Sequence, residues 1–166
     1  MNQLRAVELD FLDNAPNRWD FEADVHARPA EVFAAICADP SNWTEWFPGL
    51  EQGAYESAAP HGVGTTRAIT MTGLVYRETL LAWDEPTRWA YRVDETTADM
   101  FHALAEDWVV EPKGDHAVVR WTFAIDPKAE IVPLLGDLPA IVGKVFDDAM
   151  AGLDTYIKER ASSAAG

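Results

Sequence analysis

Two opposite charges, Arg67 and Glu78, stand at the ends of the stretch "RAITMTGLVYRE". The stretch predicts two strands joined by a two-residue turn at Thr72-Gly73, which pairs Met71 with Leu74 and Arg67 with Glu78. Arg67 could hydrogen-bond a ligand carbonyl or carboxylate and stabilise developing negative charge through its fixed fork of donors. The alternative is a structural ion pair with Glu78.

Glu106 and His102 are the other polar residues that the same alternation places toward the middle of this sheet face. Glu106 could transfer a proton if burial raises its pKa toward neutrality. Glu78 is the weaker candidate because Arg67 opposes such a rise. His102 lies near the end of its strand, where simple exposure to solvent is favoured over a role in the site.

Counting outward from the expected turns extends this face across the sheet. The turns "DEPT" and "EPKGDH" predict these cross-strand pairs: Ala82 with Trp89, Leu80 with Tyr91, Val110 with Ala117, Trp108 with Val119, Glu106 with Trp121, and His102 with Ile125. Charges among so many aromatic residues fit neither full solvation nor a solid core. We therefore predict a wet or ligand-filled cavity beneath this face.

Periodicity along the chain predicts the elements that hold these residues. Alternation from Trp19 predicts the first strand, and two short helices follow, the first with Pro29 in its first turn and the second with Asp39 as its cap. Short turns then predict an antiparallel meander with strands at 50–56, 62–71, 74–83, 87–95, 101–111 and 116–126. A long amphipathic helix is predicted over 137–160, where Gly143 and Gly152 suggest close approach of another element.

The composition limits the classes of function. The 166 residues predict a polar arm at 1–16, one ligand-binding domain at 17–161 and a flexible tail at 162–166. Thirteen basic against 28 acidic residues give a net charge of −15, which argues against nucleic acid and anionic membranes as partners. No apolar stretch approaches the length of a membrane span, and the lone Cys37 fits a reducing compartment. We predict a cytoplasmic protein without membrane insertion.

Signals for metals and cofactors are lacking in the sequence. The histidines His26, His61, His102 and His116 do not have the spacing of metal ligands, and one cysteine gives no zinc motif. Phosphate-binding and nucleophile-elbow motifs are also absent. The sequence therefore predicts neither a metal nor a cofactor.

The order of these elements, together with "DPSNWTEWFPG", "GVGTTRAITM" and "YRETLLAWDEPTRWAYRV", resembles the START-like (SRPBCC) superfamily of polyketide cyclase/dehydrase and lipid-transport-like proteins. The resemblance covers about residues 17–160. It implies an α+β helix-grip fold, in which a curved seven-stranded antiparallel sheet surrounds a long C-terminal helix. It also implies a hydrophobic small molecule in the cavity. In some relatives a cavity arginine polarises a polyketide carbonyl, and Arg67 stands where such a residue is expected.

Three functions follow as hypotheses. The leading one is binding of a lipid-, polyketide- or aromatic-like ligand; the alternatives are a polyketide cyclase or dehydratase that uses Arg67 and Glu106, and a protein-binding or co-chaperone module. Catalysis thus stays open, as does the choice between a monomer and a homodimer. The candidate ligand-binding residues are Trp43, Trp46, Phe47, Arg67, Ile69, Tyr76, Glu78, Tyr91, His102, Glu106, Trp108, Trp121, Phe123, Phe146 and Met150.

Overall fold

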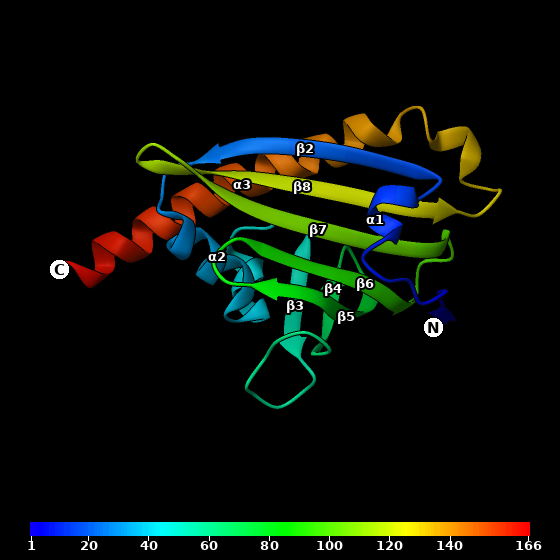
Figure 1. Ribbon diagram of the computed structural model, residues 1–166, viewed down its shortest axis with the longest axis horizontal. Coiled ribbons are helices and arrows are strands. Elements are labelled where there is room, and N and C mark those ends of the chain that lie inside the picture. Colours follow the sequence, from blue (N-terminus) through cyan, green and yellow to red (C-terminus); the bar gives the residue numbers. More distant parts are fainter.

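The structure, a computed structural model, describes residues 1–166 and places one long helix against one curved sheet (Figure 1). The elements in chain order are β1 (Asn2–Gln3), α1 (Phe11–Asn14), β2 (Asn17–Val25), α2 (Pro29–Cys37), the 3-10 helix η1 (Pro40–Glu45), β3 (Leu50–Tyr55), β4 (Thr66–Met71), β5 (Leu74–Asp84), β6 (Arg88–Thr96), β7 (Phe101–Lys113), β8 (His116–Pro127), the 3-10 helix η2 (Val132–Leu134) and α3 (Leu138–Ala164).

The sheet has the strand order β2-β8-β7-β6-β5-β4-β3, and every neighbouring pair is antiparallel. Short turns connect successive strands from β4 to β8, while β2 returns to pair with β8. The two-residue β1 pairs separately with β6. The predicted helix-grip fold is therefore confirmed, with β1 as an addition.

The β4–β5 hairpin has the predicted register. Met71 pairs with Leu74, and Arg67 pairs with Glu78. The turn residues Thr72 and Gly73 have φ values of 48° and 77°, which are the positive angles that a tight hairpin turn of this kind requires. The two charges are consequently direct cross-strand neighbours.

A bulge in β5 overturns the predicted pairing of Ala82 with Trp89. The register shifts between Leu80 and Ala82, so that Trp83 pairs with Trp89 and Ala82 with Ala90. An extra residue in one strand reverses which face the following side chains occupy. Leu81 thus packs on the outer face, as Ala82 does, while Leu80 belongs to the main core between the sheet and α3.

The β7–β8 register also differs from the prediction, by two residues. The strands continue to Lys113 and His116 around a turn that contains Gly114 at φ 63°. The predicted pairs Val110–Ala117, Trp108–Val119 and Glu106–Trp121 are wrong: the observed partners are Val119 for Val110, Trp121 for Trp108 and Phe123 for Glu106. A shift of two residues keeps every side chain on its predicted face.

His102 is an exception to that rule. The register of β7 and β8 shifts between Phe101 and Ala103, which leaves His102 exposed while Phe101 is buried. The inward placement of His102 and its pairing with Ile125 are therefore wrong, and the exposure that was favoured for this residue is confirmed. Leu104 pairs with Ile125 instead.

The segment predicted as a polar arm packs on the sheet face opposite α3. In Figure 1, α1 lies in front of the sheet and α3 lies behind it. Val7, Phe11 and Leu12 are buried there against small side chains, which are Ala82, Ala90, Ala103, Ala105 and Ala124. The ion pair of Arg92 with Glu8, 2.8 Å long, also ties the arm to β6. Apolar and polar contacts together hold residues 1–16 in place.

The long helix α3 buries Phe146, Ala149, Met150 and Leu153 against the sheet. It continues to Ala164, so it includes the start of the predicted tail. None of the helices combines the length and the apolar character that crossing a membrane would require.

Both glycines of α3 mark close approaches, as predicted. A Cβ atom at Gly152 would lie 2.4 Å from the backbone oxygen of Trp46, which follows η1 directly. A Cβ atom at Gly143 would lie 2.9 Å from the ring of Phe21, which is half-buried. The backbone at Trp46 cannot yield as easily as a side chain can.

We expect Gly152→Ala to lower the free energy of unfolding by about 1 to 2 kcal/mol, because overpacking outweighs the gain of up to about 1 kcal/mol in helix propensity. Gly143→Ala is the matched control, and we expect it to change stability by less than about 1 kcal/mol because the Phe21 ring can move. Urea denaturation of both variants measures the difference. Equal effects would contradict the close approach at Gly152.

Candidate ligand-binding pocket

A pocket of about 320 Å³ lies between the inner face of the sheet and the first half of α3. Eighteen of its 21 lining residues are hydrophobic, and its volume is at the lower end of the range typical of ligand sites. The lining residues are Trp43, Phe47, Leu50, Ile69, Met71, Thr72, Leu74, Tyr76, Glu78, Tyr91, Val93, Met100, Phe101, Leu104, Glu106, Trp121, Phe123, Leu138, Ile141, Val142 and Val145.

The pocket reaches the surface beside the β4–β5 turn and the first turns of α3. Thr72 and Ile141 are its exposed lining residues, and 60% of the Ile141 surface is accessible. Other lining residues, among them Tyr91, Glu106 and Trp121, are buried. A ligand would therefore enter past apolar side chains and meet the carboxyl group at depth.

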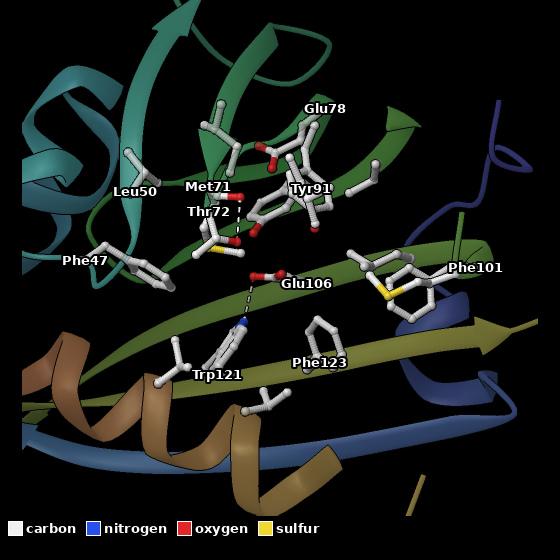
Figure 2. A pocket seen from close by; sticks show the side chains of 18 of the residues that line it. Phe47, Leu50, Met71, Thr72, Glu78, Tyr91, Phe101, Glu106, Trp121 and Phe123 are labelled. Atoms are coloured by element: carbon white, nitrogen blue, oxygen red, sulfur yellow. Dashed lines mark hydrogen bonds between the residues drawn. The ribbon is translucent and has the colours of Figure 1, made fainter. Parts of the chain in front are cut away.

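Glu106 lies between Tyr91 and Trp121 in Figure 2. Its Oε2 atom accepts a hydrogen bond of 2.8 Å from the Trp121 indole Nε1 and a longer one of 3.4 Å from the Trp108 Nε1. Burial raises the pKa of Glu106 to about 7, although the Tyr91 hydroxyl and the Trp121 Nε1–H oppose that rise. The carboxyl group can therefore hold or release a proton near neutral pH.

Arg67 and Glu78 form a fully buried ion pair, with 2.5 Å between Nε and Oε2. The Arg67 Cζ atom lies 4.7, 4.6 and 4.9 Å from the ring centres of Trp43, Trp89 and Tyr91. Such cation–π contacts stabilise a desolvated guanidinium, although its Nη1 and Nη2 atoms have no hydrogen-bond partner. Burial raises the pKa of Glu78, and Arg67 offsets part of that rise.

The ion pair presents only its carboxylate side to the pocket. Glu78, Trp43 and Tyr91 line the pocket, whereas Arg67 does not. The cation thus lies behind the pocket wall, enclosed by the same side chains that form it.

The structure brings many of the predicted site residues together at the pocket. Those in the lining are Trp43, Phe47, Ile69, Tyr76, Glu78, Tyr91, Glu106, Trp121 and Phe123. Those outside the lining are Trp46, Arg67, His102, Trp108, Phe146 and Met150. Apart from the exposed His102, the residues outside are buried and pack behind or beside the pocket.

Sequence reasoning missed three groups of lining residues. The first comes from α3, where Leu138, Ile141, Val142 and Val145 recur at helical spacing, a signal that was available in the sequence. The second comes from strands whose inward parity was already known, and it includes Met71, Leu74, Val93 and Leu104. Met100 and Phe101 depend on the irregular start of β7, which no sequence pattern revealed.

The arrangement of sheet, long helix and enclosed pocket defines the helix-grip class of START-like proteins. A match to the family described as polyketide cyclase / dehydrase and lipid transport covers residues 18–158, and the chain belongs to this family. An uncharacterized protein of Mycobacterium tuberculosis is 32% identical over 125 residues, which cover 75% of this chain and 74% of that protein.

Solved structures share the fold at low sequence identity. A START superfamily protein of Mycobacterium smegmatis has a TM-score of 0.65 and 14% identity, with coverage of 86% of this chain and 97% of that chain. A protein of Thermus thermophilus has a TM-score of 0.70 and 17% identity, with coverage of 87% of this chain and 99% of that chain. At such identities the similarity concerns the fold alone.

We expect Arg67→Met to lower the free energy of unfolding by about 3 to 5 kcal/mol, because it leaves the Glu78 carboxylate buried without its cation. The double variant Arg67→Met/Glu78→Gln should recover at least about half of that loss, since both charges are then absent. The matched control is Arg77→Met on β5, an exposed ion-pair residue whose loss should cost at most about 1 kcal/mol. A change of under about 1 kcal/mol in the single variant would contradict the structural role of Arg67.

Glu106 should make the stability depend on pH. Its pKa is 4.5 in the reference state and about 7 in the fold, so between these values the folded state keeps a proton that the unfolded state has released. This contribution makes stability fall by roughly 3 kcal/mol as pH rises through that window, and it is constant above it.

The variant Glu106→Gln lacks this titration. Its free energy of unfolding relative to the wild type should therefore increase by roughly 3 kcal/mol between about pH 4 and pH 8, as measured by urea denaturation at a series of pH values. A constant difference across that range would show that the folded-state pKa is not raised.

Proposed function

We propose that this protein binds a hydrophobic small molecule, of lipid, polyketide or other aromatic-like chemistry, in the pocket between the sheet and α3. The observation that carries the proposal is the predominantly apolar lining of a pocket of about 320 Å³, in which Glu78 and Glu106 are the only charged residues. Globular cores normally contain few voids larger than a water molecule, so a pocket of this size is more typical of a ligand-binding site than of ordinary packing. The family description, which includes lipid transport, supports the same reading.

The placement of Arg67 favours binding over the cyclase mechanism in which this residue polarises a carbonyl. Arg67 lies behind the lining, and its Nε atom is engaged by Glu78. A catalytic electrophile must reach the position where charge develops on the substrate. Glu106 alone retains the properties of a proton-transfer group, which leaves a dehydratase-like reaction as the second candidate.

The remaining features of the hypothesis stay predictions. They are a cytoplasmic location, a monomeric or homodimeric state, and the absence of nucleic acid among the partners. The acidic balance of the chain, with a net charge of −15, supports the last of these.

Titration with diphenylhexatriene, a hydrocarbon fluorophore that brightens in apolar surroundings, tests the proposed function. We expect saturable binding by the wild type and an affinity reduced about tenfold or more in Val142→Trp, whose indole would fill the pocket beside α3. Ala151→Trp is the matched control, because Ala151 is exposed on the same helix and outside the lining. Absence of saturable binding, or equal binding by both variants, would refute a ligand site in this pocket.

A further inference from the structure

The charged residues that line the pocket are all acidic. Beside the tyrosine hydroxyls of Tyr76 and Tyr91, the lining contains three polar residues, Thr72, Glu78 and Glu106. Neither lysine, arginine nor histidine lines it. Both ionisable groups that can carry charge near neutral pH are therefore carboxyls.

Two of these three polar residues already have a partner within the protein. The Thr72 hydroxyl donates to the backbone oxygen of Met71 at 2.8 Å, and this residue is exposed at the pocket edge. The Glu78 carboxylate accepts from the buried Arg67 Nε. The charge of Glu78 is therefore already paired within the protein, and the Thr72 hydroxyl proton is already engaged.

Glu106 differs because no cation hydrogen-bonds to it. Its protein donors are all neutral: the indole groups of Trp121 and Trp108, both directed at the same oxygen, Oε2, and the hydroxyl of Tyr91. A carboxylate has two oxygens and about four acceptor positions, so these contacts leave acceptor capacity for another donor. A buried carboxylate without a positive partner is stabilised by further donors, and a ligand in the pocket can supply one.

We propose that the pocket selects apolar molecules that end in a hydrogen-bond donor, a hydroxyl or an amine, bound by Glu106, and that it excludes molecules that end in a carboxylate. This inference rests on the proposed function, because it specifies the ligand of the same pocket. An amine or hydroxyl donates to Glu106 in surroundings of low polarity, where such a bond is strong.

A ligand that ends in a carboxylate would bind poorly in this pocket. It would be desolvated beside Glu106 and Glu78, and the only buried cation close by, Arg67, lies behind the lining and already pairs with Glu78. An unpaired buried charge is strongly unfavourable, and like charges in surroundings of low polarity repel each other. The net charge of −15 adds a long-range repulsion of anions. Fatty acids should therefore be poor ligands, in contrast to a pocket whose arginine faces the ligand.

The test compares three molecules that share one chain, decanol, decylamine and decanoate, as competitors of diphenylhexatriene at about pH 8, where Glu106 is ionised. We expect decanol and decylamine to bind about tenfold or more tightly than decanoate. Decanoate binding as tightly as decanol would overturn the inference. If diphenylhexatriene itself does not bind, the proposed function fails first, so the two failures are distinguishable.

The variant Glu106→Gln assigns the preference to one residue, since it removes the charge and keeps the size. The ratio of the decanoate and decanol dissociation constants should fall by about threefold or more, because the repulsion by Glu106 is lost while the cost of burying the decanoate charge remains. Glu111→Gln, which removes a half-buried carboxylate on the same strand that does not line the pocket, should keep the wild-type ratio. An unchanged ratio in a folded Glu106→Gln protein would overturn the role of Glu106. The comparison of the three competitors on the wild type stands even if that variant does not fold.

Discussion

The buried pair of Arg67 and Glu78 is the interaction around which the inner face of the sheet is organised. Burying a guanidinium is costly unless it is paired, and here a carboxylate bonds its Nε atom and three aromatic rings contact the rest of the group. Its neighbours come from η1, β5 and β6, so one side chain on β4 connects four elements. A buried ion pair adds little net stability compared with apolar residues of equal volume, but any slip of register would leave both charges unpaired. The position of the pair is therefore compatible with only one register of β4 and β5.

The same pair determines the chemistry of the pocket. Arg67 lies outside the pocket lining, whereas Glu78 and Glu106 belong to it. The charged groups in this mainly apolar pocket are therefore carboxylates, which accept hydrogen bonds. Two indole groups hold Glu106 without neutralising it, which distinguishes it from Glu78. The pocket thus contains two carboxyl groups: Glu78, whose charge Arg67 neutralises, and Glu106, whose protonation can change near neutral pH. Polar groups of this kind within an apolar lining are suited to recognition of a polar end on an apolar molecule.

The sequence alone predicted the order of the elements, the β4–β5 register and the inward face, because turn geometry and alternation along strands determine these features. It did not predict the bulge at Leu81 or the irregular start of β7, which depend on packing against elements distant in sequence. Those two irregularities explain why Ala82 and His102 were misplaced. Arg67 was identified as inward but its role was left open, because only the three-dimensional arrangement separates a side chain in the pocket wall from one behind it. The lining from α3 was accessible from the helical spacing of Leu138, Ile141 and Val142 and was nevertheless overlooked.

Residues 1–16 pack on the outer face of the sheet, so the folded domain includes them. The family match starts at residue 18, yet Val7, Phe11 and Leu12 cover alanine side chains of β5, β6, β7 and β8. A protein shortened to the matched segment would retain the whole pocket and lose this cover. The uncovered strip of small apolar side chains would be flat and accessible, the kind of surface through which sheets associate with one another. Aggregation of such a shortened protein would consequently report on the outer face of the sheet and would carry no information about ligand binding within it.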